Sequence, residues 1–320
     1  MTLICRCEIN PDTFVMEVRA KMAIQQNEEI TTRYVDPWEG QPNRQLKIGQ
    51  NWNFICNCLR CKDPSDLGTY FSAIVCQRCS NYISSNERCA SKSSAYIGSA
   101  ISNNHGYLLP IDCEYIETHW HCINCGEKKC ARDIEDLLNE VVKSVESVKQ
   151  DILVQMEENF PKVVDSIKSS IDLIQTFVHP NHFLLYQFKK WITELPIPKS
   201  SVAPIGKKEP DGTINDHNIV HDILTKSVFL ELKQKCHLDL LIIIESLDPG
   251  FTLNRAGHIK KLARNRMQLS QLNLSVDPEN YTDVEHMAQM KMAFSELKLV
   301  SDSFKYPETK CTETNECQVM

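Results

Sequence analysis

The 320-residue sequence contains no long apolar run. Its longest strongly aliphatic stretch covers residues 240–244, far short of the roughly 20 residues that span a bilayer. Residues 1–7 hold no apolar segment of signal-peptide length. We therefore expect a protein of the cytoplasm, the nucleus or both, with no membrane association.

The sequence also lacks a surplus of positive charge. Its formal net charge is −7, and the stretch 53–130 balances seven lysines and arginines against seven acidic residues. Proteins that bind nucleic acid gather Lys and Arg on one face, where they neutralise phosphates. A zinc ribbon that binds nucleic acid is therefore the least favoured function for this chain.

What the chain does contain is cysteine, at 15 positions, with two groups at metal-ligand spacing. Without an export signal these thiols stay reduced, so zinc is favoured over disulfides. The more complete group joins two pairs, Cys76-x2-Cys79 and Cys122-x2-Cys125. Four thiolates close the tetrahedral shell of zinc, so we predict a structural site. The nearby residues that could substitute as ligands are His119, His121, Cys113 and Cys130.

The other group, Cys56-x-Cys58-x2-Cys61, supplies three thiolates and needs a fourth ligand from elsewhere. No histidine is tied to a cysteine by a recognisable motif, so the sequence argues against a cysteine nucleophile. We expect His258 and His286 to lie at the surface of helices.

The first fifty residues favour short strands. Apolar and polar residues alternate around Phe14, Met16 and Val18, and the stretch 30–34 is a second β-prone run. Two strands bury too little apolar surface to be stable alone. They must pack on the zinc region, on the helical half, or on sheet that this chain does not contain.

After residue 130 the apolar spacing becomes helical. We predict a helix marked by apolar positions from 134 to 152, a second after Pro161, and a third that Asn181 caps and that ends near residue 195. Further helices are expected at 217–247, 254–273 and 279–301, with Pro278 in the first turn of the last one. Prolines and glycines make 196–212 a loop, and residues after 305 form a tail.

The order of these motifs resembles the SET and MYND domain (SMYD) family of protein-lysine methyltransferases, in particular its arthropod branch. Five segments carry the resemblance, and their order is more specific than any one alone. They are NEEITTRY at 27–34, the cysteine cluster at 52–61, GYLLP at 106–110 before Cys122, and the turns HPNH at 179–182 and LDPG at 247–250.

The resemblance implies roles for several residues. Tyr34 matches the tyrosine that orients the lysine amine beside the transferred methyl group, and Phe54 matches the aromatic that stacks on the adenine of S-adenosylmethionine. The family pattern takes the fourth ligand of the first zinc site from Cys7, with Cys5 as the competing candidate. In this chain alone, both aromatics are interpreted as structural, Tyr34 at a strand end and Phe54 in the core beside zinc.

Other parts of the family pattern are absent. The segment 3–11 keeps a cysteine and an Asn-Pro pair but not the Asn-His that holds the methyl donor, and the sequence holds neither the glycine-rich SET segment nor the MYND module. We therefore expect this chain to be inactive alone, with methyl transfer reserved for a longer form.

The predicted fold is α+β, a small β-rich SET remnant with two four-cysteine zinc sites followed by an all-α, tetratricopeptide-like domain. The expected divisions are the SET remnant at 1–50, the post-SET cluster at 51–66, a zinc-ribbon-like insert at 67–130, the helical domain at 131–305 and a tail at 306–320. The alternative function is a zinc-stabilised helical module that binds proteins or peptides. We expect a monomer.

Overall fold

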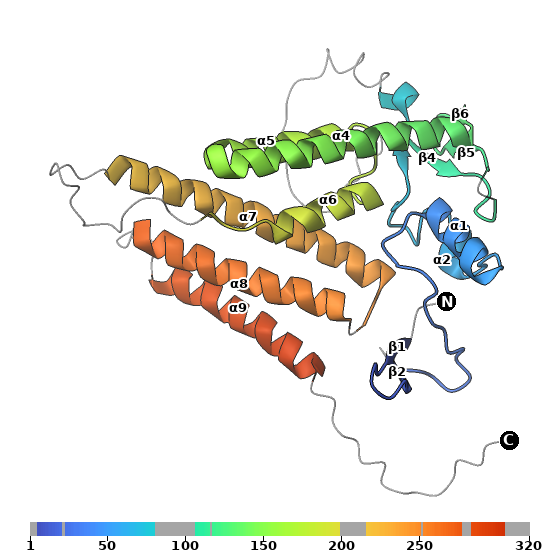
Figure 1. Cartoon of the computed structure of the whole chain (residues 1–320), viewed down its shortest axis with the longest axis horizontal. Coiled ribbons are helices and arrows are strands. Elements are labelled where there is room, and N and C mark those ends of the chain that lie inside the picture. Colours follow the sequence, from blue (N-terminus) through green and yellow to red (C-terminus); the bar gives the residue numbers. More distant parts are fainter. Residues whose placement is uncertain are drawn as a thin grey trace, which may run out of the picture.

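The computed structural model describes residues 5–20, 23–80, 106–115, 117–198, 216–250, 252–276 and 283–304. The strands are β1 (Cys5–Ile9), β2 (Met16–Ala20), β3 (Ile74–Val75), β4 (Tyr107–Pro110), β5 (Trp120–Cys122) and β6 (Lys128–Lys129). The helices are α1 (Gln41–Trp52), α2 (Leu59–Lys62), α4 (Ala131–Glu158), α5 (Phe160–Gln175), α6 (Phe183–Glu194), α7 (Asp216–Leu247), α8 (Leu253–Val276) and α9 (Asp283–Phe304). The predicted α+β class is confirmed (Figure 1).

Two antiparallel sheets make up the β structure of the described residues. β1 pairs with β2, while β3, β4, β5 and β6 form a four-stranded sheet in sequence order. The second sheet gains a further contact from the α5–α6 connection, because Val75 N–H donates to the Phe177 carbonyl over 2.8 Å and His179 N–H donates to the Ala73 carbonyl over 3.0 Å. This pairing fixes the cysteine-rich insert to the helical half.

The largest hydrophobic core lies between that insert and the helices. Ile74, Leu108 and Trp120 from the sheet pack with apolar residues of α4, α5 and α6. A second cluster joins the chain before α1 to the helical half, since the Trp38 ring stacks on the Tyr186 ring with centroids 4.6 Å apart. The insert and the segment around Trp38 therefore share their cores with the helices.

The helical half follows the predicted periodicity closely. α4, α5, α6, α7 and α8 cover the predicted ranges, and α5 begins with a proline in its first turn. α7, α8 and α9 lie side by side in sequence order (Figure 1). Among the described residues, none of the helices is both long and apolar enough to cross a membrane.

Several local predictions are wrong. Residues 30–34 form no strand, because none of the described strands pairs with them. Residues 41–50, in the stretch where short strands were predicted, belong to the helix α1. The cap of α6 is His182, whose Nδ1 accepts from Leu184 N–H over 3.2 Å. Asn181 instead donates from Nδ2 to the Thr69 carbonyl over 3.1 Å.

His258 was expected at the surface but is buried. Its Nδ1 lies 3.0 Å from Nδ1 of His237 across the α7–α8 contact, which places one imidazole against the other. Residues outside the described part of the chain include Pro278, positions 199–212 of the loop predicted at 196–212, the predicted tail from 305, and the side chain of His286.

Candidate functional site

The second cysteine group forms a compact cluster of four sulfurs. Cys76 and Cys79 follow β3, Cys122 ends β5, and Cys125 lies in the turn before β6. Sγ of Cys76 lies 3.6 Å from Sγ of Cys125, and Sγ of Cys79 lies 3.7 Å from Sγ of Cys122. A tetrahedral zinc with bonds of about 2.3 Å separates its sulfurs by about 3.8 Å. These two separations match a tetrahedral zinc, so the four thiols could hold one.

Gly106 makes room for this cluster. A Cβ on residue 106 would lie 2.5 Å from Sγ of both Cys79 and Cys122 and 3.2 Å from Cβ of Asn124. Any side chain there would occupy the space that the sulfurs now fill. No local pattern in the sequence explains the glycine of the segment GYLLP. The close approach of two sulfurs to residue 106 explains why it is a glycine.

The alternative ligands of this site do not enter the cluster. The Cys113 carbonyl accepts from Gln41, and Cys130 caps the start of α4. His119 is exposed and His121 is half-buried. Among the described residues, the groups that could hold a metal contain cysteines alone.

The first cysteine group brings Cys56, Cys58 and Cys61 within 4.8 Å of one another. Hydrogen bonds from Cys56 and Cys61 lower the pKa of the Cys58 thiol to about 2, which favours the thiolate, the form that binds metal. Cys7 and Cys5 lie on β1, but their side chains fall outside the described residues. A fourth ligand from β1 stays a prediction, and the three thiols present can hold zinc.

A buried charge network supports this cluster. Asp66, fully buried, accepts from Arg44 Nη2 over 2.5 Å and from Arg60 Nε over 3.1 Å. Ser72 donates its hydroxyl to the same carboxylate over 2.8 Å. Two guanidinium groups on one carboxylate leave a surplus positive charge. Cys61 of the neighbouring cluster adds an interaction that raises the pKa of Arg44, after that of Asp66.

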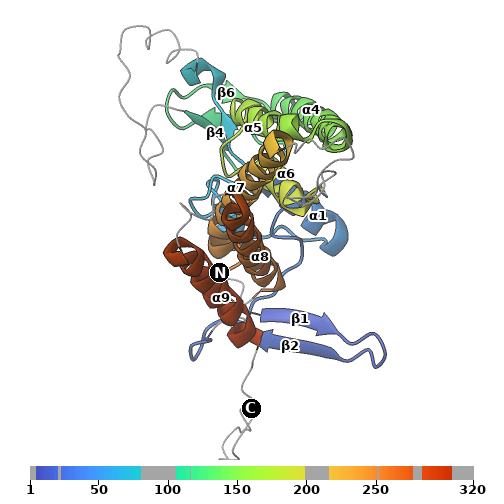
Figure 2. The ribbon, with the colours of Figure 1, turned by 90° about the vertical axis from the view of Figure 1, so that its left-hand side faces the viewer.

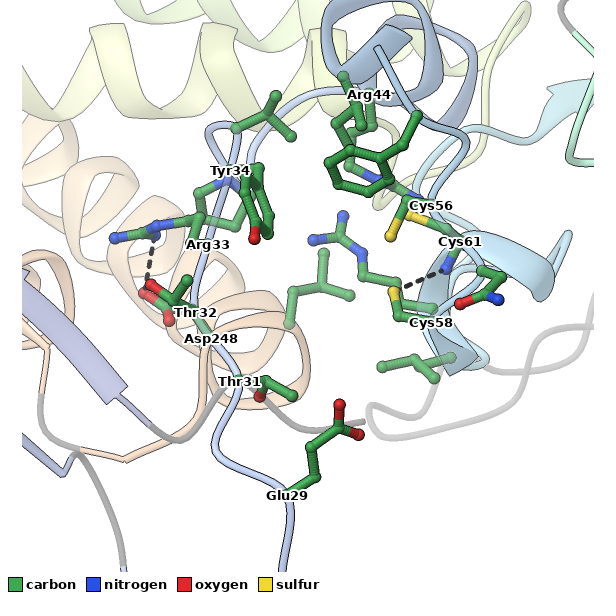
Figure 3. A pocket seen from close by; sticks show the side chains of 18 of the residues that line it. Glu29, Thr31, Thr32, Arg33, Tyr34, Arg44, Cys56, Cys58, Cys61 and Asp248 are labelled. Carbon is green, nitrogen blue, oxygen red and sulfur yellow. Dashed lines mark hydrogen bonds and ion pairs between the residues drawn. The ribbon is translucent and has the colours of Figure 1, made fainter. Parts of the chain in front are cut away.

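A cavity of about 640 Å³ lies beside the first cluster. One wall is the segment 29–35, and a second is the loop that carries Phe54 and the three cysteines. A third, at 246–249, is the end of α7 and the turn that follows it. Figure 3 shows the Tyr34 hydroxyl pointing into this space, opposite Cys56, Cys58 and Cys61. Three stretches far apart in the sequence thus enclose one volume.

Tyr34 and Phe54, the two residues predicted for the methyl donor and substrate, both line the cavity. Their rings meet edge to face with centroids 5.1 Å apart, and the Tyr34 ring meets Trp52 in the same way at 5.3 Å. Tyr34 is 47% exposed and Phe54 37% exposed. The interpretation of Phe54 as a core aromatic is therefore wrong, because its ring forms part of an open wall.

An ion pair closes the third side of the cavity. Arg33 Nη1 lies 3.6 Å from Oδ2 of Asp248, a buried residue just after α7 (Figure 3). Sequence reasoning identified Asp248 only as part of a helix-ending turn. It also missed Arg33, Arg44 and Arg60 as cavity residues, since charged residues carry no periodic signal that would place them there.

No protein-family model matches the chain. The SET domain-containing protein SmydA-8, isoform B, of Drosophila melanogaster is 26% identical over 162 residues, which cover 49% of this chain and 31% of that protein. Histone-lysine N-methyltransferase SET5 of Meyerozyma guilliermondii is 46% identical over 50 residues, 16% of this chain and 10% of that protein. The same-named protein of Yarrowia lipolytica is 42% identical over 62 residues, 18% and 14% of the two chains. The matched part spans at most about a third of these relatives.

Proposed function

We propose, from the relationship of this chain to SMYD SET-domain proteins, that it forms one wall of an S-adenosylmethionine-dependent protein-lysine methyltransferase site. The observation that carries the proposal is the meeting of Tyr34 and Phe54 on one cavity beside the first cysteine cluster. The SET5 relatives are named as histone-lysine methyltransferases, which supports the same reaction class.

Each aromatic has a distinct role in this proposal. The Tyr34 hydroxyl would accept a hydrogen bond from a lysine amine and hold its lone pair in line with the methyl carbon, so that placement supplies the rate enhancement. Phe54 would stack on the adenine ring, a contact of about 1–3 kcal/mol by analogy with other base–aromatic stacks. S-adenosylmethionine, when bound, supplies an already reactive methyl group.

The residues present fit this donor only in part. The cavity offers aromatic contacts, but the sequence has no Asn-His pair before Asn10-Pro11 that would hold the polar portions of the donor. A nucleotide site needs several convergent polar groups. We therefore infer that the 320-residue chain does not transfer methyl groups by itself and that the two cysteine clusters hold structural zinc.

Ligand-observed NMR tests the aromatic wall directly. Adenosine at high concentration should receive saturation from the protein, and Phe54→Ala should remove most of the effect. Phe14→Ala is the matched control, because Phe14 is an exposed aromatic on the β1–β2 loop, away from the cavity. Equal saturation in both variants would refute the proposed role of Phe54.

Calorimetry tests the inferred inactivity separately. Titrating S-adenosylmethionine into the purified chain should give no heat beyond dilution. Binding heat, or methylation of a histone mixture by this chain, would overturn the inference that it is inactive alone.

A second candidate function rests on a cavity in the helical half. This cavity of about 440 Å³ lies between α5, α6 and α7, with Ile171, Val228 and Leu232 among its apolar lining. Charged side chains surround it, including the Lys189–Asp239 ion pair at 2.7 Å. An apolar floor with charged edges suits an extended peptide.

Peptide binding at this second cavity is testable with one variant. Val228→Glu places a charge on the floor at a residue that is 40% exposed, so the fold should tolerate it. Peptides from a random array that bind the native chain should bind this variant weakly or not at all. Unchanged binding would move the peptide site elsewhere on the protein.

A further inference from the structure

The four cysteines of the second cluster differ in how far solvent reaches them. Cys76 is 1% exposed, Cys79 is 7% exposed and Cys122 is 2% exposed, whereas Cys125, in the turn between β5 and β6, is an exposed residue. Cysteines that bind zinc are thiolates, and exposed thiolates are the first to be oxidised. Oxidation of this cluster should therefore begin at Cys125.

A partner for the Cys125 sulfur lies close by. Its Sγ is 3.6 Å from Sγ of Cys76, so a small rotation of both side chains brings the two sulfurs within bonding distance. Sγ of Cys122 is held in place by the N–H groups of Asn124 and Cys125, at 3.4 and 3.5 Å, and faces Sγ of Cys79 at 3.7 Å. The cluster thus divides into an outer pair, Cys76 and Cys125, and an inner pair, Cys79 and Cys122.

We propose that the outer pair is an oxidation site, at which a peroxide joins Cys125 to Cys76 with release of zinc. The Cys125 thiolate attacks one peroxide oxygen, so the O–O bond breaks, hydroxide leaves and a sulfenic acid forms. The Cys76 thiolate then attacks that sulfur, which forms the S–S bond and releases a second hydroxide. The two sulfurs together give two electrons to the peroxide. The inner pair alone cannot complete a tetrahedral shell, so the metal should leave.

Strand β3 connects this site to the helical half. Cys76 directly follows β3, which pairs with β4. The hydrogen bonds from Val75 to Phe177 and from His179 to Ala73 join the same segment to the α5–α6 connection. Figure 2, like Figure 1, shows β4 and β6 of this sheet beside α5. Because the binding free energy of a structural zinc is folding free energy, zinc release should weaken the pairing between the insert and the helices.

Zinc release and disulfide mapping test the proposal on the reduced, zinc-loaded chain. About one equivalent of hydrogen peroxide should release zinc to a chromogenic chelator, and peptide mass spectrometry should find Cys76 joined to Cys125. The proposal rests on the structural zinc inferred above, which the zinc content before oxidation tests by itself. A chain that holds its zinc before oxidation but forms no disulfide between these two cysteines, or joins Cys125 to Cys122 instead, would overturn the oxidation site alone.

The variant Cys125→His separates the exposed thiol from the other ligands. Sites with three cysteines and one histidine hold zinc, so this variant should bind the metal and keep it in peroxide. Cys130→Ser is the matched control, because Cys130 is a half-buried thiol at the start of α4, outside the cluster, where serine also caps a helix. It should release zinc like the native chain.

Hydrogen exchange reports whether oxidation reaches the helices. Exchange at the amides of Val75 and His179 should quicken after peroxide in the native chain and in Cys130→Ser, but not in Cys125→His. Equal zinc release from Cys125→His and the native chain, or unchanged exchange at both amides of the oxidised native chain, would overturn the proposal. The disulfide map of the native chain decides the oxidation site even if the histidine variant fails to bind zinc.

Discussion

The substitution Gly106→Ala tests the sulfur cluster at the point where the structure leaves no room. The new Cβ would lie 2.5 Å from two sulfurs, about 1 Å short of the 3.4 Å at which ordinary contact begins. Zinc–sulfur bonds of about 2.3 Å vary by only about 0.2 Å, so the cluster cannot absorb this shift with all four ligands bound. At least one thiolate must leave the metal, or the strand β4 must move.

The energetic cost follows from these two outcomes. Overpacking alone destabilises a core by about 1–3 kcal/mol, and loss of a structural zinc costs more, because its binding free energy is folding free energy. For a chain of this size we expect the melting temperature to fall by about 2–4 °C for each kcal/mol. The zinc content should fall by one ion per chain, since the first cluster lies elsewhere.

Metal analysis and thermal unfolding should be measured on the same preparation. Gly49→Ala is the matched control, because Gly49 lies in α1 and a Cβ added there would meet no atom within 4 Å, while alanine in a helix interior is favoured by about 0.5–1 kcal/mol. If Gly106→Ala keeps its full zinc content and melts at the native temperature, the close approach of the two sulfurs to residue 106 is refuted.

Three further predictions concern buried polar groups. Asp66→Asn should destabilise the fold by about 3–5 kcal/mol in urea unfolding, because two buried guanidinium groups lose their carboxylate; a cost below about 1 kcal/mol would contradict the network. Burial lowers the pKa of His182 and of His237 to about 3. Each neutral ring therefore contributes stability that is fully present above the unfolded pKa of about 6.5. This stability is lost as the pH falls from about 6.5 toward about 3. The urea midpoint should therefore drop between about pH 7 and about pH 5, with a shallower slope in His182→Gln, and equal slopes would count against burial of that ring. Tyr186→Phe should cost about 1 kcal/mol through the lost hydrogen bond from Asn254 at 3.2 Å, measured as a lower urea midpoint, whereas an unchanged midpoint would show that this bond adds nothing.

Local signals were sufficient for the cysteine clusters and most helices. The spacing Cys76-x2-Cys79 forms a single turn whose two sulfurs converge whatever surrounds it, and the apolar periodicity after residue 130 encodes α4 through α8. In both cases the determinant lies within a few residues along the chain. Tertiary contacts are therefore not needed to predict these clusters and helices.

Other features were decided only by neighbours distant in sequence. Residues 30–34 have strand propensity but pair with none of the described strands, and they form a cavity wall. His258 is buried where α8 packs on α7, with its ring against that of His237. The cavity itself joins Tyr34 to the end of α7, more than two hundred positions away, through the Arg33–Asp248 ion pair. The sequence by itself thus determined where the cysteine clusters and helices lie, whereas the cavity that they line depends on packing between segments, for which no local pattern carries information.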